Sequence, residues 1–265
     1  MTVFVGTSGW QYRDWRTSFY PTKLPQGEWL PYFAAWFGAV EVNNTFYRLP
    51  RREVFAAWRQ RTPPDFVFAL KMSRYLTHLR RLRDPEEPVE RFLAAAGGLG
   101  DKLGPILLQL PPEMPVDAAR LDAALRVFPA RLRLAVEFRD DSWYCGPVRE
   151  VLAAHGAALC LADRDEDLVT AEWRTADWGY VRFHWGRAGA GYSDAALSAW
   201  AGRIDRFWPE PADVYAFFNN DPQCHAVRDA VRLARDLRAL GREVARTPDE
   251  TEVHVGAYRP PKGRG

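Results

Sequence analysis

Short strand-like segments and helix-like segments alternate along nearly the whole chain, and this alternation limits the fold more than any other feature of the sequence. The predicted strands are Val3–Thr7, Val40–Asn44, Phe66–Lys71, Pro105–Leu110, Arg133–Phe138, Ala158–Ala162, Gly179–His184 and Val214–Phe218. The predicted helices are Trp29–Phe37, Arg51–Arg61, Pro88–Ala96, Asp117–Phe128, Pro147–His155, Asp194–Phe207 and Pro222–Leu240. Parallel strands need long crossover connections, which are usually helices. The pattern therefore predicts one α/β domain, a single (β/α)8 TIM-like barrel.

One barrel helix is expected to be missing, because Arg164–Asp177 shows no apolar stripe of helical period. Asp117 is expected to cap one helix and Gly156 to close another. The barrel is predicted to span residues 1–245, and residues 246–265 to form a flexible tail. An open doubly wound sheet is the alternative. Its nucleotide-binding versions lose support, because no Gly-x-Gly-x-x-Gly follows the first strand and no P-loop is present.

The stretch Ala39–Arg48 indicates that the sheet encloses a polar site. Val40 and Val42 alternate with Glu41 and Asn43, so one face of this strand is apolar and the other is polar. Apolar helices flank the strand, and a parallel sheet is normally covered on both sides. The polar face therefore needs a cavity or polar partners.

Polar side chains occur late in most of the other predicted strands as well. With Glu41 and Asn43, the set comprises Lys71, Gln109, Glu137, Arg139, Asp163, Arg182, His184, Asn219, Asn220 and Asp221. The carboxyl ends of the strands build the active site in this architecture, so these groups are expected to meet at the barrel mouth. A buried structural network of ion pairs is the competing interpretation.

The balance of charges in this set favours a polar pocket that works without a metal. Negative charges come from three acidic residues and positive charges from three basic ones: Glu41, Glu137, Asp163, Lys71, Arg139 and Arg182. The predicted catalytic residues, which would move protons or polarise a carbonyl, are Glu41, Lys71, Glu137 and His184. The remaining members of the set are predicted to bind the substrate.

No cofactor is predicted, and a divalent metal is the alternative. Hard cations prefer a surplus of carboxylate ligands, whereas here lysine and arginine compete for the carboxylates. A metal site formed by Glu137, Asp163, His184 and Asp221 stays open. Two carboxylates would also serve glycoside hydrolysis, whose mechanism depends on the distance between the two carboxyl groups. The sequence does not give that distance.

Aromatic residues follow several predicted strands and are expected on the rim of the mouth. They are Trp10, Tyr12, Trp15, Phe46, Tyr47, Trp143 and Tyr144. Among them Trp10, Tyr47 and Trp143 are predicted to bind substrate by stacking on a sugar ring or a base. Packing within loops is the plainer explanation of the same pattern.

Composition restricts the partners and the compartment. The net charge of +2, from 36 basic and 34 acidic residues, gives no strong attraction to nucleic acid or to a membrane surface, although nucleic acid is not excluded. The expected partner is a small polar or anionic molecule, and the oligomeric state is left open. Three widely spaced cysteines form neither a metal motif nor a disulfide framework, and no apolar run is long enough to span a membrane. A cytoplasmic location is therefore expected.

Several short motifs together resemble the YecE-like family, a domain family of unknown function, over about residues 3–240. They are Gly6-Thr7-Ser8-Gly9-Trp10, Glu41-Val42-Asn43-Asn44-Thr45-Phe46-Tyr47, Lys71 with Thr77-His78, Leu107-Leu108-Gln109-Leu110-Pro111-Pro112, Glu137-Phe138-Arg139 with Ser142-Trp143, Arg182-Phe183-His184, and Phe218-Asn219-Asn220-Asp221. The resemblance implies a TIM-barrel-like fold described as related to sugar isomerases, which is an analogy of fold only. This chain departs from the usual family pattern at Trp185, where a glycine normally follows the histidine directly, and at Cys224, where a glycine is usual.

These observations favour an enzyme that performs proton-transfer chemistry, of isomerase or lyase type, on a small sugar-like or sugar-phosphate substrate. Two other functions stay open. One is a binding or regulatory barrel without turnover, and the other is a metal-dependent phosphodiester or glycoside hydrolase.

Overall fold

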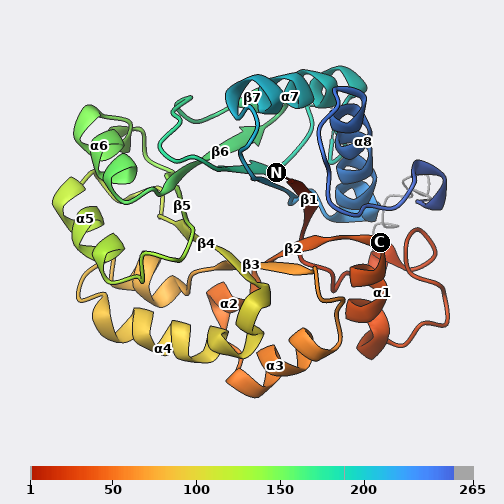
Figure 1. Ribbon diagram of the computed structural model, residues 1–265, viewed down its shortest axis with the longest axis horizontal. Coiled ribbons are helices and arrows are strands. Elements are labelled where there is room, and N and C mark those ends of the chain that lie inside the picture. Colours follow the sequence, from red (N-terminus) through yellow and green to blue (C-terminus); the bar gives the residue numbers. More distant parts are fainter. Residues whose placement is uncertain (1, 188, 254–265) are drawn as a thin grey trace, which may run out of the picture.

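Eight parallel strands form a closed barrel in the computed structural model, which describes residues 2–187 and 189–253 (Figure 1). The barrel strands are β1 (Val3–Ser8), β2 (Ala39–Val42), β3 (Val67–Lys71), β4 (Leu103–Gln109), β5 (Leu134–Glu137), β6 (Ala158–Arg164), β8 (Gly179–Phe183) and β9 (Val214–Phe218). Their order is β5-β4-β3-β2-β1-β9-β8-β6, and pairing of β5 with β6 closes the ring. The prediction of a TIM-like barrel is confirmed.

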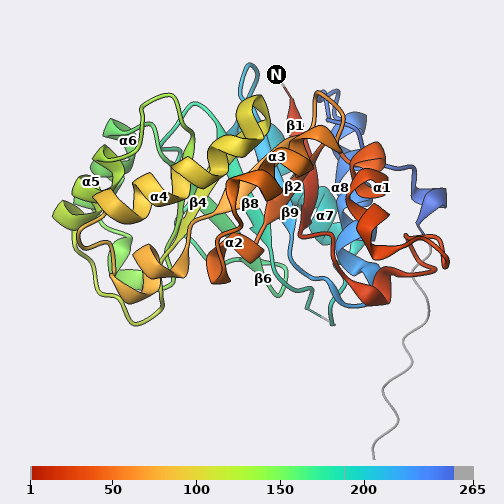
Figure 2. The ribbon, with the colours of Figure 1, turned by 90° about the horizontal axis from the view of Figure 1, so that it is seen from below.

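Helices surround the strands (Figures 1 and 2). They are α1 (Trp29–Trp36), α2 (Asn44–Tyr47), α3 (Arg52–Gln60), α4 (Glu86–Ala96), α5 (Ala118–Arg126), α6 (Gly146–Ala154), α7 (Asp194–Phe207) and α8 (His225–Ala239). The Asp117 carboxylate accepts a hydrogen bond from the Arg120 N–H and caps α5, as predicted. Gly156 follows α6 with φ +57°, a left-handed conformation that suits glycine, also as predicted.

The connection between β6 and β8 contains no helix, which confirms that prediction. The two-residue strand β7 (Asp167–Leu168) pairs antiparallel with β6 instead. The chain then returns to the barrel at β8 through residues 169–178, in which no regular element is assigned.

The alternation of side chains separates two apolar layers. The larger layer lies between the strands and the helices, and the smaller one fills the barrel interior. Alanines on several strands leave room inside the barrel for large rings; the interior cluster is Ala39, Ala69, Leu107, Ala135, Ala158, Cys160, Trp178, Tyr180, Tyr215 and Phe217. The next inward positions toward the carboxyl ends are polar, and they build the mouth.

Several element boundaries differ from the sequence-based expectation, and two of the differences have a clear structural cause. The second strand ends at Val42 and not at Asn44, because Thr45 turns the chain into α2: its hydroxyl lies 2.9 Å from the Val42 carbonyl oxygen and 2.6 Å from that of Lys71. The last helix begins at His225 and not at Pro222, since Gln223 and Cys224 have φ of +56° and +68°. This left-handed conformation favours glycine, which accounts for the glycine usual at the Cys224 position.

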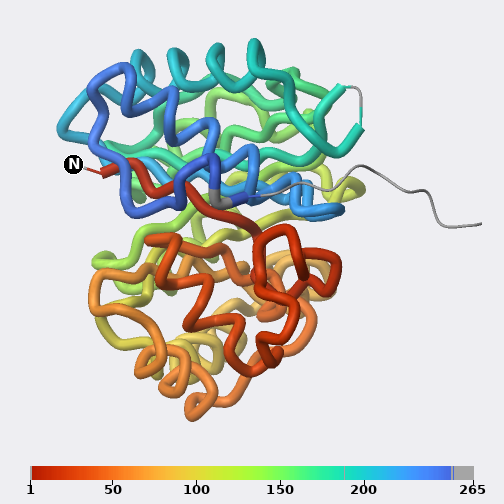
Figure 3. The backbone as a smooth tube through the Cα atoms, turned by 90° about the vertical axis from the view of Figure 1, so that its right-hand side faces the viewer, coloured from red at the N-terminus to blue at the C-terminus, as the bar shows by residue number. Residues whose placement is uncertain are grey.

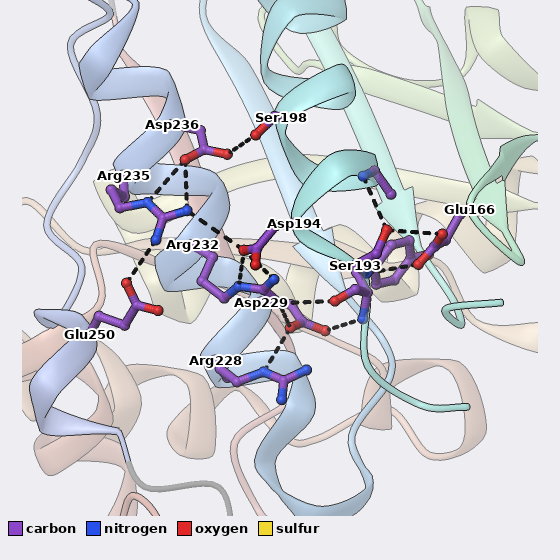
Figure 4. Close-up of polar contacts among 12 residues, drawn as sticks. Glu166, Ser193, Asp194, Ser198, Arg228, Asp229, Arg232, Arg235, Asp236 and Glu250 are labelled. Atoms are coloured by element: carbon purple, nitrogen blue, oxygen red, sulfur yellow. Dashed lines mark hydrogen bonds and ion pairs between the residues drawn. The ribbon is translucent and has the colours of Figure 1, made fainter. Parts of the chain in front are cut away.

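Ion pairs bind α7 and the C-terminal segment to α8 (Figure 4). Arg232 of α8 contacts Asp194 at the start of α7, and Arg235 reaches Glu250 at 2.9 Å. Asp229, buried beneath them, accepts hydrogen bonds from the arginines on both sides of it on α8, and Figure 4 shows it at the centre of the group.

The N-terminal strand and the C-terminal segment lie against each other (Figure 3). Val3 bridges to Val244, and β1 pairs with β9. Beyond residue 245, Arg246 pairs with Asp65 at 2.9 Å and donates to the Ala34 carbonyl. The first part of the expected tail thus contacts the barrel, while residues 254–265 lie outside the described residues and their flexibility stays a prediction.

Candidate functional site

Inward-facing positions at the carboxyl ends of β2, β3, β5 and β8 place four charged side chains together at the barrel mouth. Glu41, Lys71, Glu137 and Arg182 are each at most 9% exposed. All four have the side-chain parity that the alternating patterns of their strands indicated. Burial of so many charges requires close pairing, because an isolated buried charge is costly.

Arg182 lies between the two glutamates and binds both. Its Nε and Nη2 donate to the two oxygens of Glu41 at 2.9 Å each, and its Nη1 donates to Glu137 Oε2 at 2.7 Å. The Tyr180 hydroxyl donates to Glu41 Oε1 at 2.8 Å. The guanidinium therefore has its planar donor groups directed at two carboxylates, the geometry in which arginine binds most strongly.

A second set of contacts continues from Glu137 toward the opening. Arg139 donates from Nε to Glu137 Oε1 at 2.7 Å, and His184 Nε2 lies 3.6 Å from the same oxygen. The Asn219 amide lies 3.4 Å from His184 Nδ1 and also accepts from Asn43 at 3.3 Å. Polar groups from β5, β8 and β9 and from the end of β2 thus form one continuous network.

The paired carboxylates are held in their charged form. Burial alone would raise the pKa of Glu41, but the charge and hydrogen bonds of Arg182 lower it. The same opposition acts on Glu137, where Arg182, His184 and Arg139 together hold the pKa well below its usual range. Burial lowers the pKa of His184, helped by Arg182, so its imidazole is neutral at pH 7. Carboxylates this strongly paired are poor proton acceptors.

Lys71 differs from the other charged groups of the mouth, because its amine has no matching partner. Among the described residues its ammonium makes no hydrogen bond or ion pair, and its nearest aromatic contact is the Phe46 ring, 4.2 Å from Nζ to the centroid. Burial lowers the Lys71 pKa to about 8, and the positive charge of Arg182 adds to the effect. A substantial fraction of this amine is therefore neutral near physiological pH.

Asp221 follows β9 and is a second group that titrates near neutrality. Burial raises the pKa of its carboxyl to about 7, and the charges of Asp14 and Glu41 act in the same direction. Its Oδ1 is buried and has no hydrogen-bond partner among the described residues. Lys71 and Asp221 are thus two predicted site residues whose pKa values suit acid–base chemistry near neutral pH.

We expect the Asp221→Asn variant to be more stable than the wild-type protein at pH 8 and equally stable at pH 4. The folded pKa of Asp221 is raised above the unfolded value, so the native state binds the proton more tightly, and stability falls as pH rises from about 4 to about 7. Replacing the carboxyl removes this loss, which we place at about 2 kcal/mol after allowance for partial screening. Urea denaturation at pH 4, 6 and 8 measures it, and exposed Asp101→Asn serves as the control. An Asp221→Asn effect of equal size at pH 4 and pH 8 would contradict the assigned titration.

A cavity of about 140 Å³ opens beside these groups, between the ends of β1 and β2. It is lined by Ser8, Gly9, Trp10, Gln11, Tyr12, Val42, Asn43 and Asn44. Asn43 Oδ1 is buried there without a hydrogen-bond partner in the described part of the chain. Such an orphaned acceptor is an available contact for a hydroxyl or amine of a ligand.

Two of the polar residues predicted to bind substrate lie elsewhere. Asp163 was assigned to the mouth, but it has the opposite parity to the inward-facing Cys160 and points toward α7, where Tyr192 Oη and Trp200 Nε1 each donate to it at 2.6 Å. Asn220 also leaves the mouth: its amide donates to Asp229 and to the Ala190 carbonyl. Both residues anchor the segment between β8 and α7.

The predicted aromatic rim is largely buried. Trp143 is completely buried, its ring stacks on Phe138 at 4.9 Å and its N–H donates to the Met114 carbonyl, so it is a packing residue. Trp10 lines the cavity but is only 3% exposed and packs edge-to-face against Trp58, so it offers no open stacking face. Tyr47 is 74% exposed and contacts Phe46. Gln109 lies beside Glu137 in the β4–β5 register, as its parity indicated.

Two residues of the site were missing from the predicted set. Tyr180, which donates to Glu41, shares the parity of Arg182 on the same strand, and this parity was the available signal. Ser8 pairs in register with Glu41 and lines the cavity, but an isolated serine at the end of an apolar strand carries no such signal.

The proposed metal ligands do not gather. Within residues 2–187 and 189–253, no group of three His, Cys, Asp or Glu side chains is placed to hold a metal ion. Asp163 accepts hydrogen bonds from Tyr192 and Trp200, and Glu137 forms ion pairs with two arginines. The ligand set of Glu137, Asp163, His184 and Asp221 is therefore divided between separate hydrogen-bond networks. In the same ranges, no helix has both the length and the apolar character needed to cross a membrane.

Comparison with known proteins identifies relatives over most of the chain. A family described as "Protein of unknown function DUF72" matches residues 4–252. The UPF0759 protein YecE of Escherichia coli is 29% identical over 143 residues, and the matched region spans 54% of this chain and about half of the length of that relative. The UPF0759 protein YunF of Bacillus subtilis is 25% identical over 254 residues, covering 83% of this chain and 89% of that protein.

Solved structures show the same fold. A DUF72 family protein from Thermotoga maritima, 29% identical, superposes with a TM-score of 0.77 over 90% of this chain and all of its own. A DUF72 family protein from Enterococcus faecalis, 19% identical, gives a TM-score of 0.76 over 89% of this chain and 96% of its own.

Proposed function

The chain belongs to the DUF72 family of proteins of unknown function, and we propose that its barrel mouth is the active site of an enzyme that transfers protons on a small sugar-like or sugar-phosphate substrate, isomerising or cleaving it. One observation carries the proposal. Lys71 is buried at the carboxyl end of β3, its ammonium makes no hydrogen bond to any described residue, and its pKa is lowered to about 8. Structural lysines are normally paired, so an amine in this state is suited to proton transfer at neutral pH.

The residues around Lys71 take complementary roles in this proposal. Lys71 removes a proton from carbon next to a substrate carbonyl, and Asp221 returns one from its neutral acid form. Asn43 and Asn219 bind substrate hydroxyls, and Arg139, whose side chain is 28% exposed, binds an anionic group such as a phosphate. Glu41 and Glu137, expected from the sequence to move protons, instead hold Arg182 and fix the electrostatic field of the site.

A panel of aldoses, ketoses and their phosphates in deuterated water tests the proposal. We expect the protein to exchange a hydrogen next to the carbonyl of one class of compound, detected by mass spectrometry as a gain of one mass unit. The exchange should saturate with substrate concentration. Failure of every compound to exchange, with a compound from the panel nevertheless bound and recovered unchanged, would overturn the proposal.

A binding barrel without turnover is the second candidate, and the complete pairing of the two glutamates favours it. Glu41 and Glu137 have both oxygens hydrogen-bonded, and a rigid network of this kind also suits a preformed ligand site. The same panel separates the candidates, because binding without isotope exchange supports only this one.

The proposed compartment is the cytoplasm. All three cysteines are free, and Cys160 and Cys224 are buried. Free thiols fit a reducing environment.

A further inference from the structure

A basic groove lies outside the barrel mouth, on the surface formed by the segments after β2 and β3 and by α4. One hollow of about 530 Å³ is lined by Tyr47, Arg48, Leu49, Ser73, Arg74, Tyr75, Leu79, Pro88, Arg91 and Phe92. A second of similar size is lined by Asn44, Tyr47, Arg48, Leu49, Pro50, Arg51 and Val54. Tyr47, Arg48 and Leu49 line both hollows. The two hollows therefore form one groove, which we call the arginine–tyrosine groove.

The charge of this groove is wholly positive. Arg48, Arg51, Arg74 and Arg91 line it, and among the described residues no aspartate or glutamate does. None of these four arginines forms an ion pair with a carboxylate of the described residues, whereas Arg80, Arg235 and Arg246 elsewhere on the surface are paired. Acidic residues of α4 lie near Arg91 in the sequence but do not line the hollow. Four unpaired guanidinium groups along one depression attract an extended polyanion.

Exposed apolar side chains concentrate in the same place. The described part of the chain exposes eight large hydrophobic side chains, and four of them line the groove: Tyr47, Val54, Tyr75 and Leu79. Tyr75 also has the Arg80 guanidinium 5.5 Å from its ring centroid. Exposure of apolar rings to water is unfavourable, so a cluster of such rings beside unpaired cations indicates a binding surface.

We infer that the arginine–tyrosine groove binds single-stranded nucleic acid. Arginines that follow a phosphate backbone and aromatic rings on which bases stack are the two components of sequence-tolerant single-strand recognition. The bases of a duplex are already stacked and cannot use the rings. A peptide strand finds no free barrel edge to extend, because the eight strands close into a ring. The inference is independent of the chemistry proposed for the mouth.

The position of the groove adds a physical link to the mouth. Tyr47 packs edge-to-face on Phe46 at 5.0 Å between ring centroids, and Phe46 lies under the Lys71 ammonium. A strand stacked on Tyr47 would therefore lie one ring away from the barrel mouth.

Fluorescence anisotropy with a labelled twelve-residue oligothymidylate and the full-length protein tests the inference. The variant carrying Arg48→Ala, Arg74→Ala and Arg91→Ala should weaken binding at least tenfold and reduce the salt slope by roughly 2, since each phosphate contact on single strands contributes about 0.7. The matched control replaces exposed Arg131, Arg149 and Arg174 by alanine and removes the same charge elsewhere; its affinity should change less than threefold.

Removal of the rings provides the second arm. Tyr47→Ala combined with Tyr75→Ala should weaken binding roughly ten- to hundredfold, whereas Tyr47→Phe with Tyr75→Phe should retain it, because stacking needs the ring and not the hydroxyl. A blunt duplex of the same length should bind more weakly than the single strand.

Three results would overturn the inference. The first is equal binding by the groove and control variants. The second is loss of binding in the triple arginine-to-alanine variant together with unchanged binding in the double tyrosine-to-alanine variant. Binding would then depend on charge alone, as expected of a site for any anion. The third is binding of a polyglutamate peptide, but not of the oligonucleotide, with the same dependence on the arginines, which would identify an acidic protein partner.

Discussion

The Arg182→Met variant is expected to lose about 3–5 kcal/mol of unfolding free energy at pH 7, the cost of leaving buried charges without their partner. The guanidinium is 1% exposed and binds two fully buried carboxylates through three hydrogen bonds. Its removal leaves Glu41 with the hydrogen bond from the Tyr180 hydroxyl, and Glu137 with Arg139 and His184, as partners within the described residues. For a chain of this size the loss corresponds to a fall of roughly 10 °C in the melting temperature. Chemical denaturation followed by circular dichroism measures it.

The pH dependence identifies the origin of this loss. Glu41 and Glu137 have lowered pKa values in the folded protein, so their pairing stabilises the fold above the unfolded pKa, and the stabilisation is lost as pH falls through the folded pKa. Without Arg182 the glutamates are easier to protonate, and protonation relieves the cost. The difference between wild-type protein and variant should therefore be largest at pH 7 and shrink toward pH 4.

Two further variants separate charge from packing. Adding Glu41→Gln and Glu137→Gln to Arg182→Met should recover more than half of the lost stability, because the unpaired charges are removed. Arg59→Met, which breaks an exposed pair with Asp101, should cost less than about 1 kcal/mol. A loss below 1 kcal/mol for Arg182→Met at pH 7 would show that the two carboxylates do not depend on this guanidinium.

The sequence predicted the mouth wherever a strand has one apolar and one polar face. On β2, Val40 and Val42 alternate with Glu41, which predicts that the valines face the helices and that Glu41 faces the barrel interior. The structure confirms this arrangement. The same reasoning places Lys71, Glu137 and Arg182 correctly, because the side-chain period of a strand is two and a closed barrel directs one parity inward.

The same rule failed on β6, since both faces of that strand are apolar. Leu159 and Leu161 face the helices while Ala158 and Cys160 face the interior, and nothing in the sequence distinguishes the two sets. Extending the alternation of Leu159 and Leu161 to Asp163 therefore predicts the wrong side for its carboxylate. The prediction that Asn220 lies at the mouth was wrong for a related reason. Asn220 follows Asn219 directly, so the two neighbouring amides point to opposite sides of the end of the strand.

The aromatic residues of the loops lay beyond prediction for a different physical reason. The side chain of a tryptophan after a strand is either buried against the barrel or exposed to solvent, and which of the two occurs depends on residues distant in the sequence. Trp143 packs down because the Met114 carbonyl, 29 residues away, accepts its N–H. The lowered pKa of Lys71 depends in the same way on long-range burial and on Arg182, which lies 111 residues further along the chain.

The Lys71→Met variant is expected to lose about 10²- to 10⁴-fold in the rate of proton exchange on the substrate identified by the compound panel, the range typical of a removed general base. Methionine preserves the length and the contact with Phe46 but cannot accept a proton. In the wild-type protein the rate should be highest between about pH 7 and pH 8, because the Lys71 amine must be neutral to act as a base and the Asp221 carboxyl must be protonated to return a proton. Exposed Lys23→Met should leave the rate unchanged.

The Lys71→Arg variant distinguishes proton transfer from anion binding. Arginine keeps the positive charge at all accessible pH values but does not release its proton. If Lys71 is the base, Lys71→Arg loses the exchange as completely as Lys71→Met does. Retention of the exchange rate by Lys71→Arg would instead assign Lys71 to anion binding and would remove it as the base.

The reactivity of Lys71 can also be measured without any substrate. With a pKa of about 8, about one tenth of the Lys71 amine is neutral at pH 7, compared with about 0.04% for an ordinary lysine of pKa near 10.4. Competitive acetylation followed by peptide mass spectrometry should therefore label Lys71 much faster than Lys23 per unit of accessible amine, with a midpoint near pH 8. A midpoint near 10.4 would mean that the mouth does not depress this pKa, and proton transfer by Lys71 would then lose its physical basis even if the Arg182 network proved as stabilising as expected.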